Sequence, residues 1–235
     1  MNQRPQSAEM TPGPGFRITS DYPTLSRELV EHYSKFETPD ISDMLNRMYT
    51  MSSDIKNLVN DKPLCGVACT VKVYPGDNLM VHKALDIARP GDIIVVDAGG
   101  HTGNAVFGDM VATKAKHRGV AGFIIDGLTR DLPGLKEVGL PVYTIGVSPI
   151  GPLHRGPGEV NHPISCGGIV VKPGDLVVAD SNGVVVVRNE FAESILGKLV
   201  ERQASLEGYI AKLKKGEFSN EWVDKLLNDN GCFSE

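Results

Sequence analysis

Two apolar runs that flank one well-delimited helix constrain the fold of this chain most. The runs are residues 93–97 (IIVVD) and 120–126 (VAGFIID), and both have the character of buried parallel strands. Between them, residues 108–119 predict a helix that begins with Gly-Asp, carries cations in its last turn and stops at Gly119. Parallel strands need such a crossover, so the segment predicts a right-handed β-α-β unit.

The loop between the first strand and this helix predicts an anion-binding site. Residues 98–107 (AGGHTGNAVF) are rich in glycine and end where the helix begins. Ligands of open α/β sheets bind at this edge, and the first N–H groups of a helix, which lack partners within it, favour an anion such as a carboxylate. The donors expected here are those of Gly108, Asp109, Met110 and Val111.

The second loop brings a guanidinium and a carboxylate to the same edge. Residues 126–131 (DGLTRD) end in Arg130 and Asp131, which follow Asp109 after twenty intervening residues. Arg130 can hold a carboxylate or an enolate oxygen through its fork of donors, and Asp131 offers oxygen ligands to a divalent cation. By itself, an Arg-Asp pair is more often a surface ion pair than a functional site. When both loops are considered together, a site for a small 2-oxo acid is as well supported as a purely structural role.

The rest of the chain predicts three parts. Residues 1–20, rich in proline and glycine, predict a flexible N-terminal arm. Residues 21–189 predict one α/β domain with N-terminal helices followed by alternating strands and turns. Residues 190–235 predict a long helix, 190–216, and an amphipathic tail with Trp222 that docks either on a neighbouring subunit or on the chain's own core.

Local signals add detail to the α/β domain. Leu25, Leu29 and Tyr33 at helical spacing predict one helix, and Thr38, followed by Pro39, is the expected N-cap of the next. The tripeptide Pro-Gly-Asp is expected to form turns at each of its three positions. These positions are residues 75–77, 90–92 and 173–175.

Charge and hydropathy exclude several classes of protein. A net charge of −5 without a Lys/Arg-rich stretch speaks against direct nucleic-acid binding. No apolar run approaches the length of a membrane span and no signal segment is visible, so a cytoplasmic location is expected. The cysteines lack CxxC spacing, which favours free thiols over a zinc site. They are Cys65, Cys69, Cys166 and Cys232.

Several polar loop residues are candidates without an assigned role. His101, His154 and His162 lie in glycine-rich or proline-rich loops, where one of them could serve as a proton shuttle. They lack the spacing of a histidine metal site. Glu159 is a loop carboxylate that could cap a turn.

The sequence from residue 90 to 187 resembles the RraA-like family, which includes the class II 4-hydroxy-4-methyl-2-oxoglutarate/4-carboxy-4-hydroxy-2-oxoadipate aldolases. The matching segments include RPGDIIVVDAGG, NAVFGDMVATKAKHRGVAGFIIDGLTRD and GPGEVNHPISCGGIVVKPGD. The family's aldolases are marked by an Asp, twenty residues and an Arg-Asp pair, which correspond to Asp109, Arg130 and Asp131. The longer motif has a glycine where this chain has Ala105.

The resemblance implies a swivelling β/β/α fold, assembled as a homotrimer or homohexamer with sites near subunit contacts. It implies a lyase dependent on Mg²⁺ or Mn²⁺ that cleaves such substrates to release pyruvate, with oxaloacetate decarboxylation as a side activity. Asp131 is the implied metal ligand, and Arg130 is implied to pair with the keto or enolate oxygen. The amides of residues 108–111 would take the C1 carboxylate, and Asp109 would orient Arg130 or a metal-bound water.

Other activities remain as alternatives. The RraA members of the family regulate a ribonuclease by binding it, and members with only that role tend to lose the final acid, so Asp131 favours the enzyme. A Schiff-base aldolase would need a lysine of lowered pKa, whereas Lys114 and Lys116 lie on a charged helix face that predicts solvent exposure. A methyltransferase finds no support, because no S-adenosylmethionine-binding loop follows the first strand.

Overall fold

The computed structural model describes residues 9–232, so residues 1–8 and 233–235 lie outside the described part. The chain divides into two compact units, Met1–Leu196 and Gly197–Glu235. The predicted α/β domain of residues 21–189 falls within the first unit.

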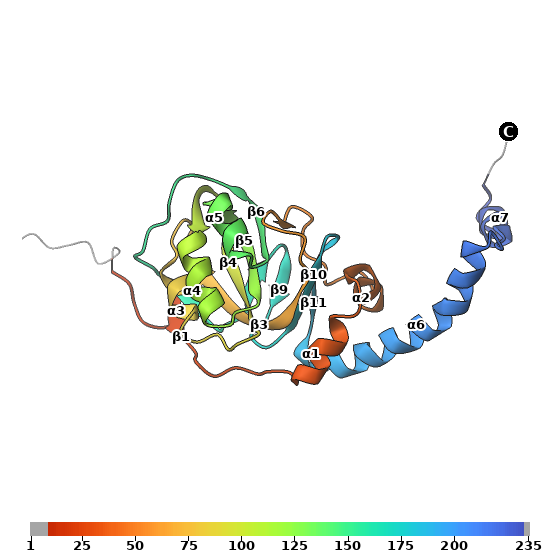
Figure 1. The fold of residues 1–235 in the computed structure, drawn as a ribbon, viewed down its shortest axis with the longest axis horizontal. Coiled ribbons are helices and arrows are strands. Elements are labelled where there is room, and N and C mark those ends of the chain that lie inside the picture. The colour runs from red at the N-terminus through yellow and green to blue at the C-terminus, as the bar shows by residue number, and fades with distance from the viewer. Residues whose placement is uncertain (1–8, 233–235) are drawn as a thin grey trace, which may run out of the picture. The chain divides into compact units, whose positions relative to one another are not determined.

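A mixed sheet forms the centre of the first unit (Figure 1). Its parallel strands are β3 (Leu64–Val73), β4 (Ile93–Phe107), β5 (Gly122–Thr129) and β6 (Val142–Val147). The outer strands are β7 (Gly158–Val160) and β2 (Lys56–Asn57), antiparallel to β3 and β6, and β1 (Phe16–Ile18), parallel to β7. The order β1-β7-β3-β4-β5-β6-β2 places β4 and β5 side by side near the middle, which confirms the predicted β-α-β unit.

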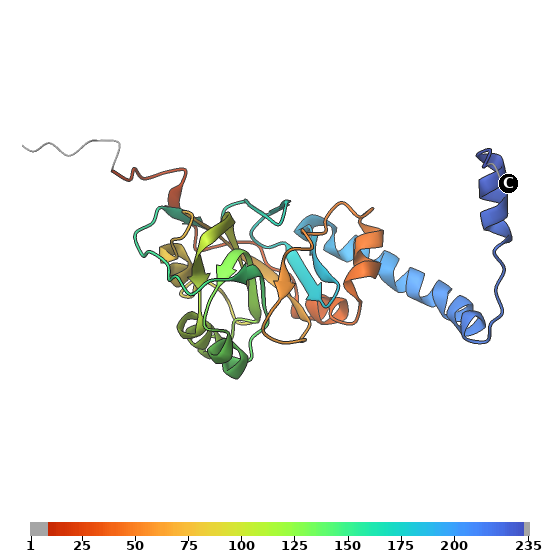
Figure 2. The same ribbon diagram turned by 90° about the horizontal axis from the view of Figure 1, so that it is seen from above.

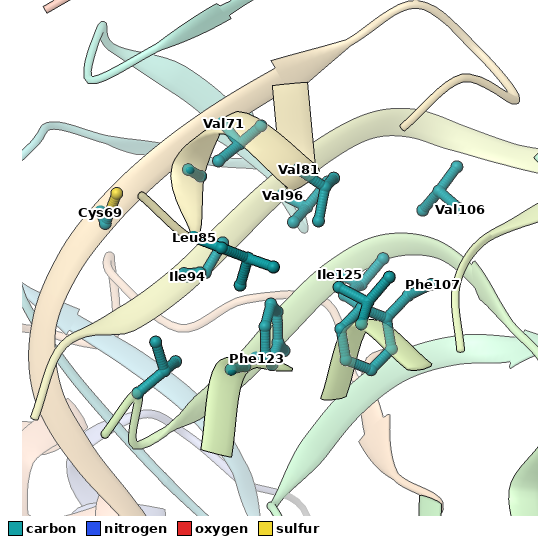
Figure 3. Close-up of a cluster of buried hydrophobic side chains, with 14 of the residues drawn as sticks. Cys69, Val71, Val81, Leu85, Ile94, Val96, Val106, Phe107, Phe123 and Ile125 are labelled. Atoms are coloured by element: carbon teal, nitrogen blue, oxygen red, sulfur yellow. The ribbon is translucent and has the colours of Figure 1, made fainter. Parts of the chain in front are cut away.

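Helices cover one face of this sheet. They are α3 (Leu79–Ala84), α4 (Asp109–His117) and α5 (Leu132–Val138). Figure 2 shows α4 and α5, in green, together on one side of the strands. Alternate strand residues such as Ile94, Val96 and Phe123 point toward Val81 and Leu85 in the apolar layer beneath the helices (Figure 3).

A second layer of strands covers the opposite face. It consists of the hairpins β8 (Ile164–Cys166) with β9 (Ile169–Val171) and β10 (Leu176–Asp180) with β11 (Gly183–Val187). The other set of alternating strand residues, including Ile93, Val95 and Ile124, packs in one cluster with Val177 and Val186 of this layer. The order of layers is therefore strand, strand, helix, which confirms the predicted α/β fold class with a β/β/α core.

The N-terminal elements differ in detail from the prediction. The helices are α1 (Arg27–Tyr33) and α2 (Thr38–Met44). Glu37 is the N-cap of α2 in place of the predicted Thr38, whose amide and hydroxyl both donate to the carboxylate of Asp180, at 2.8 and 2.7 Å. Strand β1 lies inside the predicted arm of residues 1–20, because it finds a partner in β7, which is far away in the sequence.

Strand β4 is longer than the prediction, which made residues 98–107 a loop. Its pairing with β5 is irregular after Asp97 and resumes near Phe107. Gly99 and Gly100 both have φ of 66°, which a glycine adopts without steric cost and which turns the strand out of its register. The prediction ended the strand too early because an irregular strand rich in glycine has the composition of a loop.

The aspartates of the Pro-Gly-Asp tripeptides are buried and stabilise turns. Asp77 accepts the amides of Leu79 and Arg155 at 2.8 and 2.6 Å. The other two, Asp92 and Asp175, each accept a nearby amide in the same manner. The repeated tripeptide therefore marks turns, as predicted.

The segment from Asn189 to Asp229 is helical. After the 3₁₀ turn η2 (Asn189–Phe191), the chain continues through α6 (Ala192–Lys214) and α7 (Glu221–Asp229), so the predicted long helix is present. Trp222, Leu226 and Leu227 of α7 are exposed. None of the helices among residues 9–232 is both long and apolar enough to span a bilayer. The described chain holds its cysteines as free thiols.

Candidate active site at the start of α4

A cavity of about 320 Å³ lies where β4 ends and α4 begins. It is lined by every residue that the sequence analysis placed in the site. These residues are Gly108, Asp109, Met110, Val111, Arg130 and Asp131. Segments separated by twenty residues thus meet in one hollow, as the β-α-β interpretation predicts.

Strand pairing brings the two loops together. Phe107 is the last residue of β4 and pairs with Thr129, the last residue of β5. The amide of Arg130 and the hydroxyl of Thr129 both donate to the carbonyl oxygen of Phe107, at 3.0 and 3.1 Å. Gly108 therefore lies directly beside Arg130 and Asp131.

Arg130 and Asp131 form an ion pair on the cavity wall. Arg130 Nε lies 3.1 Å from Asp131 Oδ2, and each side chain is 38% exposed. Asp131 has φ 60° and ψ 42°, a left-handed conformation that aspartate tolerates better than most residues. It is the N-cap of α5, yet its carboxylate caps no helix amide and stays directed to the cavity. Strained backbone of this kind is frequent at functional sites.

Gly108 allows this arrangement because it has no side chain. A Cβ at Gly108 would lie 2.5 Å from Asp131 Oδ2 and 3.3 Å from Arg130 Cγ. Gly151 does the same on the other side, since a Cβ there would collide with Nη1 of Arg130. The ion pair therefore lies between two glycines.

Of the two roles implied for Asp109, the contact with Arg130 is not observed, and the contact with a metal-bound water stays a prediction. Its carboxylate lies against Gly134 of α5, and no donor among residues 9–232 forms a hydrogen bond or ion pair with it. The implied orientation of Arg130 by Asp109 is not observed, because Arg130 pairs with its neighbour Asp131 instead. Asp109 thus brings a second carboxylate into the cavity wall.

The start of α4 presents unpaired backbone donors. The first hydrogen bond of the helix joins the amide of Ala112 to the carbonyl oxygen of Gly108, at 3.1 Å. The N–H groups before it have no partner within the helix, and Gly108 provides no side-chain cap. This end of the helix, which is its positive end, can accept a carboxylate.

The structure adds residues that the sequence analysis did not place in the site. They are Asn78, His82, Lys114, Pro152 and His154. The rings of His82 and His154 are 5.7 Å apart, and His154 Nδ1 lies 2.7 Å from Asn78 Oδ1. Burial lowers the pKa of His82, and Lys114 and His154 lower it further. No spacing signal connects these residues, because α3, α4 and the loop after β6 are far apart in the sequence.

The structure shows which of the lysine and histidine candidates line the cavity. Lys114 is exposed as predicted, but it also lines the cavity, whereas Lys116 Nζ donates to Val138 O at 2.6 Å. Among the loop histidines, His154 reaches the cavity, and His101 and His162 lie elsewhere, beside Asn104 and Thr19.

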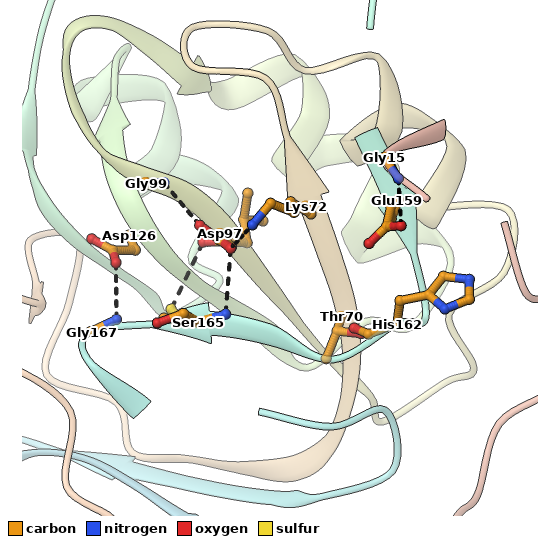
Figure 4. A network of polar contacts seen from close by, with 12 residues as sticks. Gly15, Thr70, Lys72, Asp97, Gly99, Asp126, Glu159, His162, Ser165 and Gly167 are labelled. Atoms are coloured by element: carbon orange, nitrogen blue, oxygen red, sulfur yellow. Dashed lines mark hydrogen bonds and ion pairs between the residues drawn. The ribbon is translucent and has the colours of Figure 1, made fainter. Parts of the chain in front are cut away.

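Glu159 and Ala105 have structural roles. Glu159 accepts the amide of Gly15 at 2.8 Å (Figure 4) and pairs with Arg17 at 2.7 Å. Burial acts to raise the pKa of Glu159, but these two partners outweigh it and lower the pKa. Ala105, where the longer motif has a glycine, is a buried strand residue whose amide donates to Ile150 O at 2.8 Å.

The acidic residues of the cavity suit a largely hydrated cation. No group of three or more His, Cys, Asp or Glu side chains within residues 9–232 is arranged to enclose a metal. Mg²⁺ commonly binds through one or two carboxylates with water in its other positions. Asp131 and Asp109, both on the cavity wall without a backbone amide bound to their carboxylates, fit that donor set.

Comparison with known proteins gives consistent relatives. A family model described as "Aldolase/RraA" matches residues 38–186. A protein of Halalkalibacterium halodurans is 39% identical over 180 residues, which cover 77% of this chain and 86% of that protein. One of Hahella chejuensis is 36% identical over 153 residues, 65% of this chain and 93% of the relative. Both are named "Putative 4-hydroxy-4-methyl-2-oxoglutarate aldolase".

Solved structures show the same fold. RraAS2 of Streptomyces coelicolor, described as an unusual member of the RNase ES inhibitor RraA protein family, superposes with a TM-score of 0.74 at 28% identity. The match covers 80% of this chain and 98% of RraAS2. The RNA-processing inhibitor RraA of Thermus thermophilis gives a TM-score of 0.60 at 29% identity, over 65% of this chain and 92% of that one.

Proposed function

This chain belongs to the RraA-like family, and we propose that within it the protein is a divalent-metal-dependent aldolase acting on 4-hydroxy-4-methyl-2-oxoglutarate or 4-carboxy-4-hydroxy-2-oxoadipate. The products would be pyruvate with a second pyruvate or oxaloacetate. The observation that carries the proposal is the meeting of Asp109, Arg130 and Asp131 with the amides of α4 in one cavity.

The backbone donors of α4 bind the pyruvate part of the substrate in this proposal. The N–H groups of residues 108–111 hold the C1 carboxylate at the positive end of the helix. Arg130 then faces the C2 oxygen, where negative charge grows as the carbon-carbon bond breaks and an enolate forms. A preorganised cation that binds the charged oxygen more strongly than the neutral ketone lowers the barrier.

Asp131 is the proposed ligand of the metal ion, with Mg²⁺ and Mn²⁺ as the candidates. When bound, such an ion supplies Lewis-acid stabilisation of the charge on the substrate oxygens. Asp109, whose carboxylate has no donor within residues 9–232, holds a water that accepts or returns the proton of the hydroxyl group. The same arrangement would support decarboxylation of oxaloacetate, which passes through the same enolate.

The remaining wall of the cavity suits the other half of the substrate. His82, Lys114 and His154 bring potential cations and N–H donors to the cavity wall. These groups can receive the second carboxylate. Because the lowered pKa of His82 keeps its ring neutral near pH 7, it would act as a hydrogen-bond donor and Lys114 would supply the charge.

Pyruvate release tests the proposal. The purified protein would be given 4-hydroxy-4-methyl-2-oxoglutarate, 4-carboxy-4-hydroxy-2-oxoadipate or oxaloacetate, each with Mg²⁺, with Mn²⁺ and with excess EDTA. We expect release with metal and none with chelator. Full activity in chelator would contradict the metal role, and no release from any substrate would contradict the aldolase. Borohydride added with pyruvate should leave Lys114 unmodified, since the mechanism uses no Schiff base.

Regulation of a ribonuclease by binding is the second candidate function, and the likeness to RraA structures supports it. An RNase E-type nuclease assay separates the two. Inhibition without pyruvate release would favour the regulator.

We further propose that the protein forms a homotrimer or homohexamer in the cytoplasm, with residues 190–235 at a subunit contact. Light scattering of the full chain and of a chain that ends before residue 217 would test this assembly.

A further inference from the structure

The side-chain amide of Asn104 lies outside the cavity yet joins two loops. Its Nδ2 donates to the carbonyl oxygens of Gly76 and Gly151, at 2.8 and 3.1 Å. Its Oδ1 lies 2.7 Å from His101 Nε2. The amide has one orientation, because a turn by 180° would set Oδ1 against two carbonyl oxygens, and His101 must therefore carry a proton on Nε2.

The two joined loops carry much of the cavity wall. The wall residues that follow Gly76 and Gly151 along the chain are Asn78, His82, Pro152 and His154. Backbone bonds join the same segments, since Leu153 N donates to Gly76 O and Ala105 N donates to Ile150 O, both at 2.8 Å. The side chain of Asn104 bonds to both loops at once. Asp77 also joins them, at Leu79 and Arg155, but it has no bond to Gly151.

Gly151 is also the surface against which the guanidinium of Arg130 lies. The space where a Cβ of Gly151 would stand is filled by Nη1 of Arg130. The other side of the guanidinium is held by Asp131, 3.1 Å from Nε. The position of the Gly151 backbone therefore decides where the fork of Arg130 can point.

We propose that Asn104 is a positioning residue for Arg130. Its amide holds the carbonyl of Gly151, and Gly151 holds the guanidinium in the place where it meets the substrate oxygen. The effect on turnover rests on the proposed function. The placement of Arg130 is a separate property that can be measured without any substrate.

The test replaces Asn104 by aspartate, which has the same shape but presents oxygen to both carbonyls. Asn60 offers a matched control, because its Nδ2 also donates to two carbonyls, those of Gly139 and Leu140, at 3.4 and 3.2 Å. Asn60 does not line the cavity. For the wild type, Asn104→Asp and Asn60→Asp, one would measure melting temperature, pyruvate release and the rate at which phenylglyoxal modifies Arg130, by peptide mass mapping.

We expect Asn104→Asp to lower kcat about 100-fold, as for a catalytic group displaced by about 1 Å, and Arg130 to react several-fold faster. Asn60→Asp should change neither value. Equal losses of melting temperature in both variants with wild-type reactivity of Arg130 would overturn the inference, whatever the activity. If the wild type released no pyruvate, the proposed function would fail, while the phenylglyoxal rates would still decide the placement of Arg130.

Discussion

Two clusters beside strands β4 and β5 have the same composition, two aspartates and one cation, but different surroundings. The first cluster consists of Asp97, Asp126 and Lys72, and the second of Asp109, Asp131 and Arg130. In the first, the carboxylates are occupied by the protein itself (Figure 4). Asp97 is 5% exposed and accepts the amides of Gly99 and Ser165 as well as Lys72 Nζ, at 3.0, 3.4 and 3.0 Å. Asp126 accepts the amide of Gly167 at 3.0 Å.

The second cluster leaves its carboxylates available. Asp131 pairs with Arg130 alone among residues 9–232, and Asp109 has no donor there. Both acids face a cavity instead of a hairpin. Residue type therefore does not distinguish the two clusters, whereas the number of backbone amides bound to their carboxylates does. An acid already bound by amides has little capacity left for a metal or a substrate.

The largest predicted effect is that of Asp131→Asn. Asparagine tolerates the left-handed backbone, so the fold should remain, but the proposed metal ligand loses its charge. We expect pyruvate release to fall by at least about 1000-fold, in line with several kcal/mol from a Lewis acid. Calorimetric titration with Mn²⁺ would show weakened binding. Asp126→Asn is the control from the first cluster and should keep the wild-type affinity; unchanged Mn²⁺ affinity in Asp131→Asn would contradict the assignment.

Arg130→Ala should have the next largest effect. Removal of this cation from the enolate oxygen should cost about 2–4 kcal/mol of transition-state stabilisation, visible in kcat/KM. Arg130→Lys keeps the charge but loses the fork of donors, so its kcat/KM should lie between that of the wild type and that of Arg130→Ala. If kcat/KM of Arg130→Ala fell by less than about tenfold, which corresponds to about 1.4 kcal/mol, Arg130 would be peripheral to the reaction.

Asp97→Ala should lower the stability of the fold and leave catalysis nearly unchanged. Two backbone amides and Lys72 would lose their acceptor, so the free energy of unfolding should fall by about 2 kcal/mol. Urea denaturation measures this, and kcat of the folded variant should stay close to that of the wild type. A kcat that falls as far as in Arg130→Ala would show that the two clusters are not separate.

Gly151→Ala tests the second cluster by steric means. The added methyl group meets the end of a flexible side chain, Arg130 Nη1, so stability should change little while the guanidinium moves. We expect about a tenfold lower kcat/KM, since small displacements at a reacting group are costly. Gly197→Ala, where an added Cβ meets nothing, is the control. Equal activity in both variants would show that Gly151 does not constrain Arg130.

The smallest predicted effect concerns Glu159, which resembles the first cluster in being bound by the protein. Its pKa in the folded state is lowered from 4.5, so it stabilises the fold at neutral pH, and this contribution is lost as the pH falls below 4.5 toward the folded-state pKa. Glu159→Gln should therefore flatten the acid side of the curve of melting temperature against pH. If the curve of Glu159→Gln ran parallel to that of the wild type, Glu159 would make no contribution to acid unfolding.

The β-α-β unit and its charged residues could be predicted because their signals are local. Apolar runs, a glycine stop and cations near the helix end all lie within one short segment, and the geometry of a parallel crossover then determines which loop ends meet. The length of β4 could not be predicted in the same way, since Gly99 and Gly100 have loop composition but lie in an irregular strand.

Sequence alone predicted the β-α-β unit and the meeting of Asp109, Arg130 and Asp131 at one sheet edge, because periodicity and spacing carry that information along the chain, whereas the order of the layers came from the family resemblance. The tertiary structure decided which acids stay free of backbone amides and which distant side chains complete the cavity. His82, His154 and Asn104 come from separate segments, and only packing of those segments brings them together. The physical reason is that hydrogen-bond partners and burial are properties of neighbours in space, which local sequence does not contain.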